Sequence, residues 1–150
     1  MLSQQELSDR FEIQDLIFHY SHLIDQKLFD DLRTTVFTED AHIDYSVFGG
    51  TVGDVDETIG FLKSAVTNEL FPNSQHLNAN IQITLNGDLA AARVMCFNPM
   101  EMTIGEGSTQ TYFIGLWYVD EYRRTADGWR MCRRVEERSW VFNTPDFMNL

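Results

Sequence analysis

The chain has 150 residues, 43% of them hydrophobic, and its 23 acidic against 11 basic side chains give a formal net charge of −12. This length suits one domain with its own core, so we expect residues 1–150 to form a single domain. Such a charge repels nucleic-acid phosphates and anionic membranes, and neither is an expected partner. The N-terminal residues lack a hydrophobic signal core, and no apolar run reaches the roughly 20 residues of a membrane span, so we expect a cytoplasmic protein.

Three helices are predicted in the first half of the chain. Residues 3–6, "SQQE", form a capping box, and apolar residues then recur at helical spacing as far as Ile24. A short second helix fits residues 29–37. A second capping sequence, "DVDE" at residues 54–57, begins a third helix that runs to about Leu70, just before a proline.

The second half of the chain reads as a series of β-strands. From Leu77 the apolar residues alternate with polar ones, and "NG" at residues 86–87 predicts a two-residue hairpin turn. Three longer strands follow, over residues 89–104, 110–124 and 129–142. Pro99 and Gly115 lie inside them and indicate a bulge, an edge or strong curvature. Helices followed by an antiparallel meander predict an α+β fold, with the helices on one face of a curved sheet.

The segment "HYSHLID" places His19, His22 and Asp25 close together in the sequence. On a helix these positions turn through about 300°, so the three side chains do not converge, and we predict no metal site. A solvated charge at the helix end is the alternative for Asp25. Cys96 and Cys132 lie on separate predicted strands, and we expect two buried, reduced thiols.

Five segments in order resemble the SnoaL-like branch of the nuclear transport factor 2-like superfamily: "FEIQDLIFHYSHLID", "LFDDLRTTVFTEDAHIDY", "SQHLNANIQI", "GDLAAARV" and "VDEYRRTADGWRMCRRV". The resemblance covers nearly the whole chain. It implies a cone-shaped barrel, with three N-terminal helices in the concave face of a strongly curved, mostly antiparallel sheet. The functional relatives it indicates are scytalone dehydratase and hexachlorocyclohexane dehydrochlorinase, which pair a helix-end Asp with a His on the first long strand.

This resemblance implies four catalytic residues. Asp25 in "LIDQ" and His76 in "SQHL" match the Asp–His pair, Arg134 matches an arginine of the dehydrochlorinase, and Tyr45 matches a tyrosine of the dehydratase. A neutral imidazole can take a proton, and a carboxylate behind it fixes its tautomer. Strand alternation leaves one question open: His76 shares its parity with the polar Asn78, so it faces solvent unless the pocket wall is polar here or a bulge resets the parity.

The sequence also departs from both relatives. Met100 stands where the dehydratase has a second histidine, and Tyr20 stands where the dehydrochlorinase has a lysine. Leu116 and Tyr118 replace polar residues of the dehydratase. The changes from the dehydratase argue against scytalone as the substrate, and Tyr20 argues against halide loss as the reaction. We expect an aromatic pocket whose substrate-binding residues are Tyr20, Phe48, Phe97, Met100, Tyr112 and Tyr118, with Trp117 a further candidate. Plain core packing is the alternative for each of them.

Arginines gather near the C-terminus, at positions 123, 124, 130, 133, 134 and 138. Apart from Arg134, we expect them to pair with acidic residues across a sheet or a subunit interface. Strands that carry Trp117, Trp140 and Phe142 on one parity suit such an interface, so a homodimer or homotrimer is expected.

The leading hypothesis is a cofactor-free lyase or isomerase, acting by Asp–His acid/base catalysis on a small hydrophobic, aromatic or polyketide-like oxygenated substrate. The reactions considered are dehydration or another β-elimination, a double-bond shift and a retro-aldol cleavage. The alternative is a non-catalytic small-molecule binder, or a partner subunit resembling the β subunit of ring-hydroxylating dioxygenases. A binder would keep the apolar cavity without a hydrogen-bonded Asp–His pair.

Overall fold

The computed structural model describes residues 1–148 of the chain. Its helices are α1 (Gln4–Asp25), α2 (Asp31–Thr35) and α3 (Val55–Ala65), with a single 3₁₀ turn, η1 (Ser46–Phe48). Its strands are β1 (Phe37–Asp44), β2 (Val52–Gly53), β3 (Asn73–Ser74), β4 (Leu77–Asn86), β5 (Leu89–Gly105), β6 (Ser108–Thr125) and β7 (Gly128–Phe142). The predicted α+β class is therefore confirmed.

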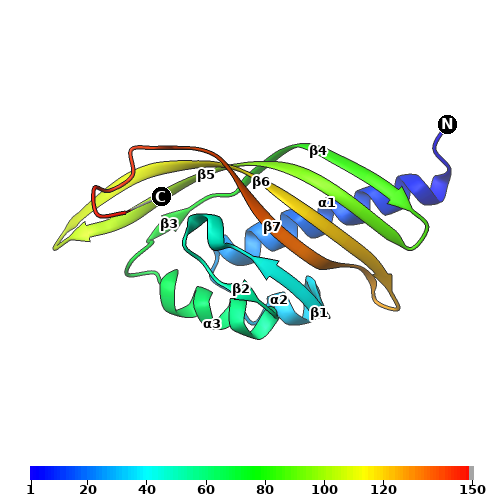
Figure 1. Cartoon of the computed structure of the whole chain (residues 1–150), viewed down its shortest axis with the longest axis horizontal. Helices are drawn as coiled ribbons and strands as arrows, with labels where there is room; N and C mark the ends of the chain where they lie inside the picture. Colours follow the sequence, from blue (N-terminus) through cyan, green and yellow to red (C-terminus); the bar gives the residue numbers. More distant parts are fainter. Residues whose placement is uncertain (149–150) are drawn as a thin grey trace.

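The strands form one sheet in the order β2-β1-β7-β6-β5-β3, and β4 also pairs with β5. Only β1 and β7 run parallel; every other pairing is antiparallel. Figure 1 shows α1 crossing behind the long, curved strands β5–β7, while α2 and α3 gather beside β1 and β2. The sheet is open between its outer strands, so the cone expected from the resemblance is not a closed barrel.

α1 and α3 begin where the sequence predicts, and α3 ends earlier. Ser3 caps α1 and Asp54 caps α3, each in a reciprocal capping box with a glutamate three residues on. α3 ends at Ala65 instead of Leu70, because the amide of Phe71 bonds the carbonyl of Thr67 in a separate turn. α2 is also shorter than predicted, since Phe37 already pairs with Met131 in the sheet.

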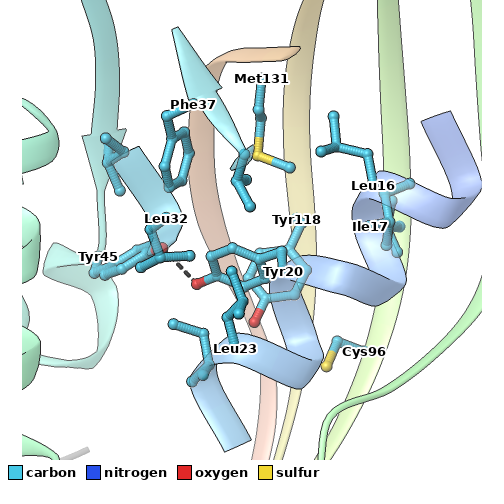
Figure 2. Packing of buried hydrophobic residues seen from close by; sticks show 14 of the residues in the cluster. Leu16, Ile17, Tyr20, Leu23, Leu32, Phe37, Tyr45, Cys96, Tyr118 and Met131 are labelled. Carbon is cyan, nitrogen blue, oxygen red and sulfur yellow. Dashed lines mark hydrogen bonds between the residues drawn. The ribbon is translucent and has the colours of Figure 1, made fainter. Parts of the chain in front are cut away.

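The core lies between α1 and the inner face of the sheet. Figure 2 shows Ile17, Tyr20 and Leu23 of α1 close to Tyr118 of β6, and all four side chains are almost fully buried. This packing fixes the rotation of α1 about its axis. It therefore also fixes the direction in which Asp25, the last residue of the helix, presents its carboxylate.

The turn and strand-break signals fall close to their predicted places. The hairpin between β4 and β5 turns through Gly87 and Asp88, one residue later than predicted, and Gly87 has φ +62°. Pro99 makes no bulge: it pairs with Phe113, and its carbonyl accepts from the amide of Gln75 at the break between β3 and β4. Proline has no N–H to donate, but the pairing of β5 with β3 and β4 is interrupted at this place. No hydrogen bond of the sheet is therefore lost.

Gly115 marks a close approach between β6 and β7. A β-carbon there would lie 2.3 Å from the Trp140 ring, so only glycine fits. The register of the two strands also shifts next to this residue.

Both cysteines are free thiols, as predicted, although Cys132 is only partly buried. No helix within residues 1–148 is long and apolar enough to span a membrane.

Candidate active site

The hydrogen-bonded pair predicted between Asp25 and His76 is present. Nδ1 of His76 lies 2.7 Å from Oδ1 of Asp25, and the backbone amide of His76 donates to Oδ2 at 3.0 Å. Ser74 of β3 donates its hydroxyl to Oδ1 at 2.9 Å. The end of α1 and the β3–β4 segment thus hold one carboxylate by three contacts, and the imidazole is fixed in position and rotation.

A strand irregularity turns His76 toward the interior, which answers the question that alternation leaves open. The register between β4 and β5 shifts between Ala79 and Gln82, and Asn80 has φ +47°. The shift reverses which residues of β4 face the core. Before the shift, Asn78 faces inward and donates to Ser21 of α1; after it, Ile83 faces inward. His76 lies on the inward side together with Asn78.

The electrostatics of the pair favour one protonation pattern. Burial raises the pKa of Asp25, but hydrogen bonds from His76 and Ser74 outweigh it, and the net result lies below the ordinary value. An ionised Asp25 accepts from Nδ1–H, so Nε2 of the neutral imidazole carries the free lone pair. Nε2 makes no hydrogen bond within residues 1–148. The pair can therefore act as a proton acceptor.

His76 lines a mostly apolar cavity of about 360 Å³. Six predicted site residues line the same cavity: Tyr20, Tyr45, Phe48, Met100, Tyr112 and Tyr118. Asp25 does not line it and lies behind His76, as an orienting group would. The cavity has the size of a small-ligand site.

Two tyrosine hydroxyls meet at the wall of this cavity. The Oη atoms of Tyr20 and Tyr45 lie 2.5 Å apart, as the dashed line in Figure 2 marks. Burial raises the pKa of Tyr20 to about 12 and that of Tyr45 well above its usual value. Both phenols are therefore protonated at neutral pH, and one of the two protons is free to serve a ligand.

Arg134 does not reach the cavity, contrary to the role expected for it. It is fully buried, with Nε and Nη2 donating to the two oxygens of Asp120 at 2.8 and 2.7 Å. Its guanidinium lies 4.0 Å from the ring centre of Tyr20 and 3.9 Å from that of Tyr118. The cation thus lies behind the two tyrosines and supports their rings. Its Nε and Nη2 are already bonded to the carboxylate of Asp120 on β6.

Phe97 is also displaced from its predicted place. It is 38% exposed on the outer face of the sheet and stacks on Phe113 at 5.5 Å between ring centres. Its neighbours Cys96 and Asn98 are the inward residues of β5. Trp117 likewise faces outward, where Arg93 covers its ring.

Glu136 and Asn98 are among the cavity residues that the prediction did not name. Asn98 is buried beside His76 and donates to the carbonyl of Gln75 at 2.8 Å. Glu136 lies on β7 opposite Tyr118. The resemblance implies that Arg134 belongs to the site, and alternation along the strand would then have indicated Glu136 two residues on.

The other histidines of the first helix lie outside the site. His19 contacts the hydroxyl of Thr35 at 2.9 Å, and His22 is exposed. Within residues 1–148, no three His, Cys, Asp or Glu side chains form a group that could hold a metal ion. Metal-free protein remains a prediction, and elemental analysis of protein purified without chelator should find no stoichiometric zinc, iron or manganese.

Three of the five arginines predicted to pair with carboxylates do so, whereas Arg130 donates to backbone carbonyls. Arg123 binds Asp40, Arg124 binds Asp9 and Asp88, and Arg133 lies near Glu121. These partners belong to the same chain, so none of these ion pairs requires a subunit interface.

Residues 5–135 match the SnoaL-like domain family. The chain belongs to this family. The SnoaL-like domain is also 46% identical to the uncharacterized protein Rv2910c of Mycobacterium tuberculosis over 138 residues, which cover 92% of this chain and 90% of that protein.

Solved structures agree on the fold of this SnoaL-like domain. The Kfla4162 protein from Kribbella flavida is 25% identical, with a TM-score of 0.79 over 91% of this chain and 94% of that one. A Novosphingobium aromaticivorans protein provisionally named a scytalone dehydratase is 19% identical, with a TM-score of 0.82 over 96% and 93%. Hexachlorocyclohexane dehydrochlorinase LinA-type3 from Novosphingobium barchaimii is 16% identical, with a TM-score of 0.78 over 96% and 95%. The predicted resemblance is confirmed.

Proposed function

We propose that this SnoaL-like domain is a cofactor-free lyase or isomerase in which His76 takes a proton from carbon. The observation that carries the proposal is an imidazole held by Asp25 through Nδ1, with Nε2 free, in the wall of an apolar cavity. A base in such a cavity can remove a proton next to a carbonyl group. The names of the dehydratase and dehydrochlorinase relatives support an elimination.

The lining of the cavity suggests the kind of substrate. Aromatic and aliphatic walls favour a small, uncharged, hydrophobic molecule. The Tyr20–Tyr45 pair offers a hydroxyl proton to a carbonyl oxygen, whose negative charge grows as the α-carbon loses its proton. Asp25 orients the base, and Tyr45 polarises the carbonyl. Phe48, Met100, Tyr112 and Tyr118 contact the rest of the substrate.

The aldol adduct of benzaldehyde and acetone tests this proposal, because it is neutral and aromatic and carries a hydroxyl β to its carbonyl. Dehydration gives a conjugated enone, retro-aldol cleavage returns the two parents, and a β,γ-unsaturated ketone probes a double-bond shift. We expect wild-type protein to accelerate one of these reactions and His76→Gln to lose that acceleration. Equal rates for wild type and His76→Gln on every probe would argue against catalysis.

A non-catalytic binder, the alternative class, has less support. Binding alone needs the cavity but not a carboxylate that orients a free imidazole nitrogen. Calorimetric binding of the enone product without turnover of any probe is the result that would favour a binder.

We also propose that copies of the chain associate through the outer face of the sheet. Phe97, Trp140 and Phe142 are exposed and, with the partly buried Phe113, form a run that we call the outer aromatic patch, with neighbouring rings 5.5 to 6.0 Å apart. Light scattering should give a dimer or trimer at micromolar concentration. Phe97→Glu should shift it toward monomer, whereas Phe18→Glu, at an exposed position on α1, should not. A monomeric wild type would disprove self-association.

A further inference from the structure

The carboxyl group of Glu136 has no role in the mechanism proposed above. It lines the same cavity as His76 and lies across from Tyr118 in the β6–β7 register. Within residues 1–148 its carboxyl group makes no hydrogen bond or ion pair. The next residue, Glu137, shows the usual behaviour of a surface glutamate: it is exposed and binds Arg93 at 2.7 Å. Glu136 therefore has its carboxyl group available to a ligand.

The surroundings of Glu136 contain both signs of charge. The titratable groups that act on it or respond to it are Arg134 on β7, Asp44 on β1, Asp120 and Tyr118 on β6, Tyr20 on α1, Tyr45 beside β1 and Cys96 on β5. Arg134 is the one cation among them, and Asp120 already occupies its Nε and Nη2. Burial raises the pKa of Glu136 to about 8, with Asp44 and Asp120 adding to the rise and Arg134 opposing it. At neutral pH the group is thus largely a protonated acid.

We propose that Glu136 is the proton donor of the site, which delivers its proton to the oxygen that leaves the substrate. The inference rests on the proposed function, because a donor is required only if a bond to oxygen breaks. It names a substrate class: neutral β-hydroxy carbonyl compounds, whose hydroxide is a poor leaving group unless it is protonated as it departs. An anionic substrate would instead repel Glu136 whenever that group is ionised.

The reaction balances with these two residues. Nε2 of His76 takes the proton from the α-carbon, and the electrons of that C–H bond form the new C=C bond. The C–O bond at the β-carbon breaks, and its oxygen takes the proton of Glu136 and leaves as water. The protein is left with an imidazolium at His76 and a carboxylate at Glu136. Transfer of one proton from the imidazolium to the carboxylate, through the water just formed, restores both groups.

Two probes that differ only in the leaving group test this assignment. The first is the benzaldehyde–acetone adduct, which must lose water, and the second is its acetate ester, which loses a stable acetate ion. Glu136→Gln keeps the shape of the side chain but supplies no proton. We expect it to lose about 10²–10⁴-fold in rate on the hydroxyl probe, the usual contribution of a positioned acid, and less than about tenfold on the acetate probe. Glu137→Gln, the matched control one residue away, should match wild type on both.

The pH profile and the infrared spectrum give readouts that a merely structural role would not change. Wild-type activity on the hydroxyl probe should fall on the alkaline side of about pH 8, and Glu136→Gln should lack that fall. A protonated-carboxyl band at neutral pH should be present in wild type and absent from Glu136→Gln. No such band, or equal losses on both probes, would overturn the inference.

The outcomes separate this inference from the proposed function. If His76→Gln abolishes turnover of both probes while Glu136→Gln affects them equally, the elimination stands and Glu136 is not its acid. If wild type turns over neither of these two probes but shifts the double bond of the β,γ-unsaturated ketone, the proposed function stands and the assignment of Glu136 fails. If wild type accelerates no probe at all, both fail.

Discussion

His76→Gln should lower kcat/KM of this SnoaL-like domain by about 10²–10⁴-fold on any substrate that it turns over, because a positioned base contributes about that much. Glutamine can still bond Asp25, but it has no nitrogen that accepts a proton at neutral pH. Asp25→Asn should also be strongly slowed, since an amide can stabilise the tautomer whose Nε2 carries the hydrogen. Initial rates for the two variants and for wild type measure the effect.

The rate of wild-type protein should also depend on pH in a definite direction. The imidazole must be neutral to act, so the rate should be lower in acid. Hydrogen bonds from His76 and Ser74 hold the pKa of Asp25 below its ordinary value despite burial, so Asp25 stays ionised in mildly acidic solution. A loss of rate there would therefore not arise from protonation of Asp25. His22→Gln, at an exposed position of α1, is the matched control and should keep the wild-type profile. Near-wild-type turnover by His76→Gln would make the histidine structural.

Arg134→Met should destabilise the fold by about 3–5 kcal/mol, the usual cost of removing one partner from a buried ion pair. The substitution leaves Asp120 buried with Tyr122 as its remaining hydrogen-bond donor, at 2.7 Å. It also removes the cation between the rings of Tyr20 and Tyr118. The free energy of unfolding, measured in urea, should show the loss directly.

Arg93→Met is the matched control for this second prediction. Arg93 also binds a carboxylate, that of Glu137, and also lies over an aromatic ring, that of Trp117 at 4.5 Å. The difference is burial: both partners of this pair are about half exposed, whereas Arg134 and Asp120 are fully buried. An exposed pair contributes about 0–1 kcal/mol, so Arg93→Met should change stability little. Equal losses in the two variants would mean that burial of the pair carries no special energetic weight.

The local features of this fold could be predicted from the sequence because neighbouring residues create them. The capping boxes at Ser3 and Asp54 need only a side chain and an amide three positions apart, and both formed. The turn at Gly87 needs only a residue that tolerates positive φ. Features that depend on distant contacts were predicted less well. After α3, which ends five residues early, the carbonyls of Glu69 and Leu70 accept hydrogen bonds from Thr103 of β5.

The site follows the same division. The order of segments along the chain was enough to pair Asp25 with His76, but the bulge between Ala79 and Gln82 that turns His76 inward was left open. Alternation within β5 could have put Phe97 on the outer face, between the inward Cys96 and Asn98; the candidate list followed aromatic character instead.

The class of fold, the family and the Asp–His pair could be predicted from the chain, since they depend on local patterns and on their order. What the charged groups of β7 contact depends instead on the three-dimensional fold. The resemblance gave Arg134 a catalytic role, and nothing along the chain indicates that Asp120 lies opposite it in the β6–β7 register. Alternation could have placed Glu136 in the cavity, but its protonation depends on burial and on charges from β1, β6 and β7. The protonation state and the partners of a charged side chain depend on all the groups that surround it in the folded protein. The order of residues along the chain does not contain that information.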